Sequence, residues 1–94
     1  MSGGHVVVVG EGEQDRDRVR YHVTVGAKEF EVTVHEEEAA LLAPGVDTKQ
    51  LVEESFHFLL EHEPVTSILP SFDLDVIEGY FPGYRREIGA RLAR

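Results

Sequence analysis

The stretch "VRYHVTVGAKEFEVTV" (Val19–Val34) decides the fold. Apolar and polar residues alternate on both sides of Gly26 and Ala27, which is the pattern of two half-buried strands joined by a tight turn. Glycine at the first central position of a two-residue loop favours a type II′ turn. The stretch therefore predicts an antiparallel β-hairpin.

The alternation also predicts how the two strands pair. If Val25 lies opposite Lys28, the apolar side chains of both strands share one face, and a slip by one residue would mix the two faces. On the polar face we expect a cross-strand charge pair between His22 and Glu31. The pairs predicted for the apolar face are Val23 with Phe30, Tyr21 with Val32, and Val19 with Val34.

Two contrasting segments precede the hairpin. "HVVVV" (His5–Val9) is a β-branched run between glycines, and it predicts either a strand buried on both faces or an extended arm. "GEGEQDRDR" (Gly10–Arg18) contains no apolar residue, so we expect a mobile, solvated loop. Residues 1–18 are therefore predicted to form a flexible arm with a short strand at 5–9, and residues 19–94 to form the domain.

Two helices are predicted after the hairpin. "HEEEAALLAPG" begins with acidic residues and ends at Pro-Gly, which indicates a short helix over Glu36–Ala43. The principal helix follows, with Asp47 as its N-cap, Gln50 at the third helical position as in a capping box, and Pro64 beyond its end. At 100° per residue, one stripe of this helix holds Val52, Phe56 and Leu59, with Leu51 and Leu60 at its flanks, and the opposite side holds Glu53, Glu54, His57 and Glu61.

The final third, "FDLDVIEGYFPGYRREI" (Phe72–Ile88), alternates carboxylates with large apolar residues. Acidic residues are favoured at helix N-termini, so Asp73 is expected to cap a short helix over Leu74–Tyr80. Pro82 suits the first turn of a last helix over Gly83–Leu92. The carboxylates therefore have an explanation that involves no chemistry.

These elements predict an α+β domain. A small antiparallel β-hairpin or three-stranded sheet would pack against one main helix and short C-terminal helices. The predicted core consists of Tyr21, Val23, Phe30, Val32, Val52, Phe56, Leu59, Ile68, Leu74, Ile77, Phe81 and Ile88.

Composition narrows the classes of function. The chain has 94 residues, 9 Lys or Arg against 18 Asp or Glu, and a formal charge of -9, which argues against general nucleic-acid binding and against anionic membrane surfaces. It has no cysteine, which excludes disulfides and thiolate chemistry. With no long apolar run and no signal-peptide pattern at its start, we expect a cytoplasmic protein. An acidic surface also suits a cytoplasm of high salt concentration.

Cations gather at the C-terminal end, at Arg85, Arg86, Arg91 and Arg94. Positive side chains in a last helical turn complement the helix dipole, and this is the structural interpretation of the cluster. The alternative is that the cluster contacts an acidic partner or the acidic face of the molecule itself.

Two sets of residues have the composition of metal sites. Glu54 and His57 have the spacing of half a helical di-metal site, and Glu61 lies one turn further on. A bundle site points inward and needs a second such pair, so a solvated face is the simpler interpretation. The acids Asp73, Asp75 and Glu78 alternate as in a calcium loop but lack its glycine and its final glutamate. No nucleophile–base set or phosphate loop stands out, and we expect no catalytic residue and no cofactor.

An aromatic group near the end of the chain is a candidate contact surface. Phe58 lies at the edge of the helix stripe, and Tyr80 and Tyr84 flank a Pro-Gly step. Such a group belongs to the core unless part of it is exposed, in which case it suits a partner or a second copy. The predicted interaction surface consists of Phe58, Tyr80, Tyr84, Arg85 and Arg86.

The segment "FLLEHEPVTSILPSFDLDVIEGYFPGYRREI" (Phe58–Ile88) resembles a family of short, uncharacterised prokaryotic proteins. In that family a small hairpin precedes a tail of the form FLLExEP, SIL, FDL, VI, YFP, Y and REI. With the hairpin included, the resemblance covers most of residues 19–88. It implies a hairpin followed by a helical tail, names no activity and carries no catalytic residue. A role beside toxin–antitoxin genes is a hypothesis that it suggests.

Three functions follow as hypotheses. The first is a non-catalytic module for protein–protein interaction or oligomerisation, with an exposed strand edge at Val6–Val9 or Lys28–Val34 as one possible surface. The second is an antitoxin-like or regulatory protein that binds a basic partner through its acidic face. The third is a metal-binding protein that uses one of the two carboxylate sets.

Overall fold

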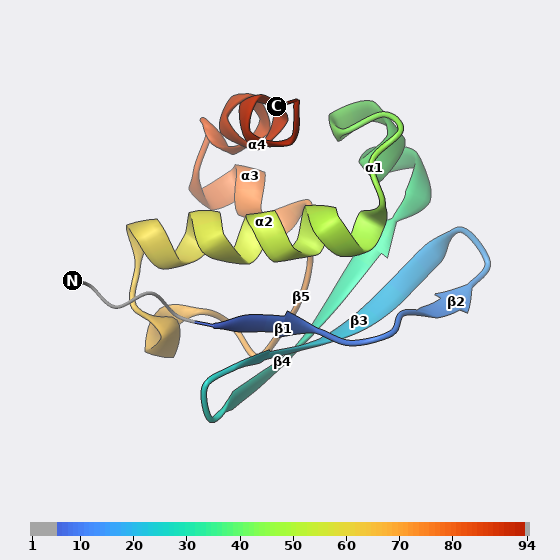
Figure 1. Ribbon diagram of the computed structural model, residues 1–94. Coiled ribbons are helices and arrows are strands. Elements are labelled where there is room, and N and C mark those ends of the chain that lie inside the picture. The colour runs from blue at the N-terminus through green and yellow to red at the C-terminus, as the bar shows by residue number, and fades with distance from the viewer. Residues whose placement is uncertain (1–5, 94) are drawn as a thin grey trace.

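The computed structural model describes residues 6–93 and has one mixed β-sheet with the α-helices on one of its faces (Figure 1). The order in the sheet is β1-β3-β4-β5, and β2 pairs with β3 beyond the end of β1. The α+β class is therefore confirmed, although the sheet has five strands. The strands are β1 (Val7–Val9), β2 (Glu13–Asp15), β3 (Arg18–Val25), β4 (Lys28–His35) and β5 (Ser71–Asp73). The helices are α1 (Glu36–Leu42), α2 (Thr48–His62), the 3-10 turn η1 (Val65–Ser67), α3 (Val76–Tyr80) and α4 (Tyr84–Leu92).

The predicted hairpin is confirmed together with its register. β3 and β4 pair antiparallel with Val25 opposite Lys28, and the apolar residues of both strands are buried. Gly26 has a φ of 62°, the left-handed value that the first central position of a type II′ turn requires. His22 lies opposite Glu31 in the register, but its ring nitrogen contacts the diagonal neighbour Glu29 at 3.6 Å. The predicted His22–Glu31 charge pair is therefore wrong.

The segment before the hairpin forms the edge of the sheet. β1 pairs antiparallel with β3, and Val7 and Val9 are buried while Val8 is exposed, so this strand is buried on one face and not on both. Within the expected loop over Gly10–Arg18, β2 also pairs with β3. The loop prediction is wrong there because the side chains of β2 are all exposed, so backbone hydrogen bonds hold the strand without any apolar pattern. His5 lies outside the described residues.

β5 is a second unpredicted strand, and it runs parallel to β4, with Val32 opposite Phe72. Asp73 was expected to cap a helix; it ends β5 instead, and α3 begins only at Val76. β5 pairs with Glu31–Thr33 in the middle of β4, so the edge expected over Lys28–Val34 is paired over that part and not at Lys28–Phe30. The three-residue strand was missed because its partner lies about 40 residues earlier in the chain, where no local pattern indicates the pairing.

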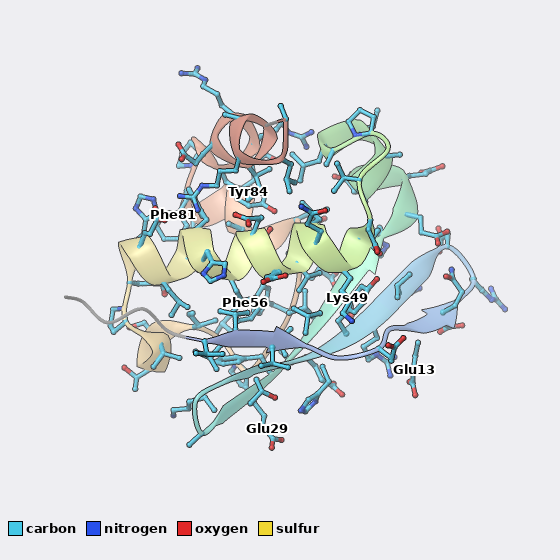
Figure 2. The ribbon with its side chains drawn as sticks, viewed as in Figure 1. Glu13, Glu29, Lys49, Phe56, Phe81 and Tyr84 are labelled. Atoms are coloured by element: carbon cyan, nitrogen blue, oxygen red, sulfur yellow. The ribbon has the colours of Figure 1, made fainter. Side chains whose placement is uncertain are left out.

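α2 lies between the sheet and α4, as Figure 1 shows. Asp47 is the N-cap as predicted, and the helix ends before Pro64. The side chain of Asp47 accepts a hydrogen bond from the backbone N–H of Lys49 and not from that of Gln50, so the predicted capping box is wrong. Phe56 points from α2 toward the sheet (Figure 2), where its ring lies 5.3 Å from that of Phe30. Because the helix contacts two layers, its buried arc is wider than one stripe and consists of Leu51, Val52, Ser55, Phe56, Phe58 and Leu59.

The C-terminal helices complete the cover of the core. α3 contacts β5, and α4 packs on α2 through Tyr84 and Ile88, with Leu92 half-buried. The two helices were predicted with bounds within one or two residues of those observed. All predicted core residues are buried except Phe81, which is half-buried against the core.

Candidate functional site

An apolar groove lies where α2, η1, β5 and α3 meet. Its volume is about 180 Å³. The lining is Leu59 and Glu63 at the end of α2, Ser67, Ile68 and Leu69 in and after η1, Phe72 in β5, Val76, Ile77 and Tyr80 in α3, and Phe81.

The rim of the groove carries large apolar side chains that the fold leaves in solvent. Tyr80 is 69% exposed, Leu69 is 50% exposed and Val76 is 37% exposed. Buried Ile68 precedes Leu69 in the chain, buried Ile77 follows Val76, and both form part of the wall. Contiguous exposed apolar side chains around a hollow indicate a contact surface more strongly than isolated ones do.

The charge at the groove is negative. Glu63 is the one charged residue of the lining, which contains no Lys, Arg or His. Glu63 has no ion-pair partner among the side chains of residues 6–93. The groove therefore combines an apolar lining with one carboxylate, that of Glu63.

The predicted interaction surface is only partly at the surface. Tyr80 is exposed as required, but Phe58 and Tyr84 are 3% and 2% exposed. Their ring centroids lie 5.4 Å apart, and Figure 2 shows Tyr84 between α2 and α4. As contact residues these two predictions are wrong, because α4 covers the flank of α2 on which Phe58 lies.

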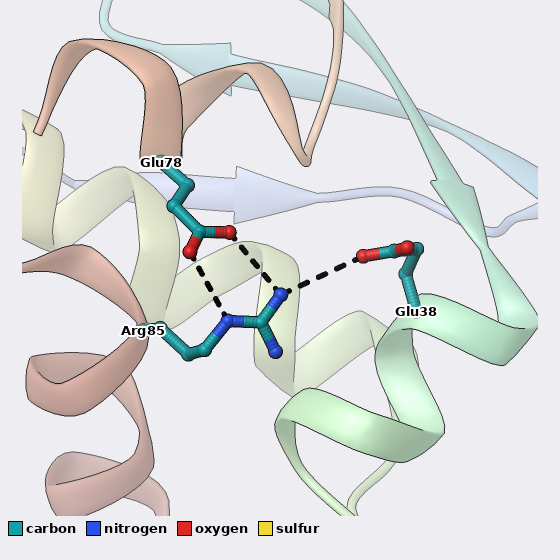
Figure 3. A network of polar contacts seen from close by, with 3 residues as sticks. All are labelled: Glu38, Glu78 and Arg85. Carbon is teal, nitrogen blue, oxygen red and sulfur yellow. Dashed lines mark hydrogen bonds and ion pairs between the residues drawn. The ribbon is translucent and has the colours of Figure 1, made fainter. Parts of the chain in front are cut away.

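Arg85 lies in the first turn of α4 and joins three helices (Figure 3). Its guanidinium donates two hydrogen bonds to the carboxylate of Glu78 in α3, at 3.1 and 3.2 Å, and lies 3.8 Å from Glu38 in α1. The hydrogen bonds that Arg85 donates to Glu78 raise the pKa of Arg85 above its ordinary value. The cation is therefore engaged within the chain, while Arg86 beside it is exposed.

Arg91 is the cation that fits the helix-dipole interpretation, since it lies in the last turn of α4. It donates hydrogen bonds to Glu61 at 2.5 Å and to Glu87 at 3.2 Å, and the bond to Glu61 raises its pKa. Its guanidinium also lies over the ring of Phe58, 5.8 Å from the centroid. Arg85 and Arg86 lie at the opposite end of the helix, so that interpretation is wrong for them, and Arg94 lies outside the described residues.

The predicted metal ligands do not come together. No group of three His, Asp or Glu side chains in residues 6–93 is arranged to hold a metal ion. Glu61 contacts Arg91, and Glu54 and His57 lie half-buried along the polar side of α2. In the other set, Asp73 lies 3.6 Å from His35 and Glu78 binds Arg85.

The sequence missed Leu69, Val76 and the groove itself. Local pattern shows that these residues are apolar, but it does not show that neighbouring segments leave them uncovered. The one available signal was the shortness of the apolar segments between Pro64 and Tyr80, which are broken by Pro70 and by acidic residues.

None of the helices in residues 6–93 is long and apolar enough to cross a membrane. Comparisons with protein-family models, curated proteins and solved structures found no match. The resemblance of Phe58–Ile88 to a hairpin-and-tail family therefore stays a prediction, and the function is argued from the groove.

Proposed function

We propose that this protein is a non-catalytic interaction module that binds another protein through the groove between α2, η1, β5 and α3. The observation that carries the proposal is the ring of exposed apolar side chains, Leu69, Val76 and Tyr80, around that hollow. Covering such side chains with a partner removes apolar surface from water, and this lowers the free energy of the complex relative to the separate proteins.

The size of the groove favours a side chain over a cofactor. Sites for small molecules measure roughly 300–1,000 Å³. The groove measures about 180 Å³, close to the roughly 150 Å³ of an apolar cavity that binds benzene. It therefore suits one large aromatic or aliphatic side chain, the anchor that dominates many protein interfaces.

A second candidate is an antitoxin-like or regulatory protein that neutralises a basic partner. The formal charge of -9 and the carboxylate of Glu63 at the groove favour it. Arg85 and Arg91 already contact carboxylates of the chain itself, so within the described part of the C-terminal arginine cluster a nucleic-acid contact would depend on Arg86.

The test is capture of a partner from the lysate of the host, with the oligomeric state measured by light scattering. The wild type would be compared with Leu69→Ser and Tyr80→Ser, which change exposed groove residues and should cost little stability. Leu41→Ser is the matched control because Leu41 is 74% exposed on α1 and does not line the groove.

We expect the wild type and Leu41→Ser to recover one stoichiometric partner, or to form the same oligomer, and the two groove variants to lose it. Equal recovery by all four proteins would place the contact elsewhere. A monomer with nothing attached in every case would contradict an interaction module.

A further inference from the structure

The free edge of β5 lies beside the groove. Parallel pairing alternates along a strand, so that every second residue directs its N–H and C=O toward the partner. Glu31 donates its N–H to the carbonyl of Pro70, and Leu74 donates its N–H to the carbonyl of Thr33. Pro70, Phe72 and Leu74 therefore face β4, and the backbone groups of Ser71 and Asp73 point away from it.

The backbone N–H and C=O groups that point away from β4 are free to accept another strand. β5 has a strand neighbour on one side only, and the described chain gives the backbone groups of Ser71 and Asp73 no partner on the other. Both residues are exposed. An edge of this kind is a template for another strand.

Phe72 connects the edge with the groove. Its side chain lies on the helix side of the sheet, where its ring is 6.0 Å from that of Phe56, and it lines the groove. A strand added alongside β5 would direct the residue opposite Phe72 to that same side. That side chain would enter the groove beside Tyr80 and Leu69.

The two neighbours of that residue would point to the other face of the sheet, which carries carboxylates. The neighbours would lie opposite Ser71 and Asp73, so the carboxylate of Asp73 adjoins one of them, while Glu31 lies on the same face one strand further away, in β4. With Glu63 at the groove and a formal charge of -9, Lys or Arg is the complementary choice for both. The ligand pattern is therefore basic, large apolar, basic.

We propose that the groove and the open edge of β5 together bind an extended segment of this pattern, which adds to the sheet as a further, antiparallel strand with its apolar residue in the groove. The inference rests on the proposed function and names the chemistry of the partner. The pattern occurs once in this chain, as Arg18, Val19 and Arg20, and there it lies inside β3 between two other strands. The occupant is thus a different protein and not a second copy.

The test uses a synthetic peptide, Ser-Lys-Val-Lys-Phe-Lys-Val-Lys-Ser, titrated into isotope-labelled protein and followed by NMR. We expect the amide signals of Ser71 and Asp73 to shift and their hydrogen exchange to slow by about tenfold or more. Replacing Phe by Ser, or all Lys by Glu, should each weaken binding by about tenfold or more, since about 1.4 kcal/mol corresponds to tenfold.

Backbone methylation separates strand addition from simple occupation of the groove. In an antiparallel pair the two Lys residues that flank Phe direct their N–H groups to β5, and the Phe N–H points to solvent. Methylating both Lys amides should weaken binding by about tenfold, because two hydrogen bonds of about 0.5–1.5 kcal/mol are lost. Methylating the Phe amide is the control and should change binding less than about threefold, since that amide makes no bond to β5.

On the protein, Leu69→Ser and Tyr80→Ser should weaken binding while Leu41→Ser leaves it unchanged. The proposal is overturned if the parent peptide fails to bind at about 1 mM, a weak affinity near 4 kcal/mol, or if the methylated Lys peptide binds as well as the parent. If the peptide fails while capture of the partner still depends on Leu69 and Tyr80, the interaction module stands and strand addition is wrong. If capture is also independent of these residues, both are wrong.

Discussion

The hydroxyl groups of Ser55 and Tyr84 form a hydrogen bond of 2.6 Å inside the core, where they join α2 to α4. Ser55 is fully buried and is the one buried polar residue among residues 6–93. Tyr84 belongs to the largest fully buried side chains. Each hydroxyl therefore depends on the other, since a buried polar group without a partner is costly.

Removing either hydroxyl group should lower the free energy of unfolding, because the other hydroxyl loses its hydrogen-bond partner. Ser55→Ala leaves the Tyr84 hydroxyl buried without a partner, and we expect a loss of about 1–3 kcal/mol in the free energy of unfolding. Tyr84→Phe should cost about 1 kcal/mol, because the Ser55 hydroxyl can turn to the backbone carbonyl one helical turn before it. Urea unfolding of the wild type, both single variants and the double variant would give the coupling free energy between the two hydroxyl groups.

Tyr80→Phe is the matched control, since the Tyr80 hydroxyl belongs to an exposed side chain and its loss should change stability by less than about 0.5 kcal/mol. If Ser55→Ala and Tyr84→Phe were as mild as Tyr80→Phe, the buried bond would contribute nothing to stability.

Tyr84 should also make stability depend on pH in the alkaline range. Burial raises the pKa of Tyr84 from 10.0 to about 12, against a smaller lowering by the hydrogen bond from Ser55. The folded state thus holds the proton more tightly than the unfolded state, so this contribution is complete below pH 10 and is lost as the pH rises toward 12. Two pKa units correspond to roughly 3 kcal/mol.

Denaturant unfolding at several pH values between pH 8 and pH 11.5 would test whether stability falls as the pH rises. The wild type should lose more stability over the range than Tyr84→Phe, which has no ionisable group at that position. Parallel curves for the two proteins would contradict a raised pKa in the folded state.

Local pattern was enough to predict the hairpin and the main helix. The alternation over Val19–Val34 admits one register, and Asp47 and Pro64 mark the ends of α2 by their own chemistry. Both features depend on residues close together in the chain.

What the sequence could not predict depends on segments far apart in the chain. β2 has no apolar residue and exists because its backbone pairs with β3, and β5 exists because its backbone pairs with β4. Phe58 is buried because α4 covers a second side of α2. The groove is the converse case, since Leu69 and Val76 are apolar residues that the rest of residues 6–93 leaves exposed.

The turn between β2 and β3 contains a residue that is unfavourable for its backbone. Arg16 has a φ of 61°, and it is the one non-glycine residue with positive φ among those described. A β-carbon makes this region costly for L-residues. Arg16→Gly should therefore raise the free energy of unfolding by about 0.5–1 kcal/mol, an increase of several degrees in Tm.

Gly26 provides the matched test of the same rule. Its φ is 62°, and a β-carbon there would meet no atom within 4 Å, so Gly26→Ala probes backbone conformation alone. We expect the free energy of unfolding of that variant to be about 1–2 kcal/mol lower than that of the wild type. A higher free energy of unfolding for Arg16→Gly and a lower one for Gly26→Ala would support a backbone cause. A loss of stability in both variants would contradict it.

Two glycines between β1 and β2 should differ sharply in their tolerance of a methyl group. A β-carbon on Gly12 would lie 2.5 Å from a methyl carbon of Val19 and 2.7 Å from the ring of Tyr21. The same atom on Gly10 would meet only the carbonyl oxygen of His22, at an ordinary 3.5 Å. Gly12 therefore lets the chain pass close over the apolar face of β3.

Gly12→Ala should lower the free energy of unfolding by about 1–3 kcal/mol, the usual cost of overpacking, because Val19 and Tyr21 are held by the core. Gly10→Ala should change it by less than about 0.5 kcal/mol. Thermal unfolding of the two variants, with hydrogen exchange at β1 and β2, would show whether the loss begins at this edge of the sheet. Equal stability of the two would mean that the N-terminal strands separate from β3 without cost to the rest of the fold.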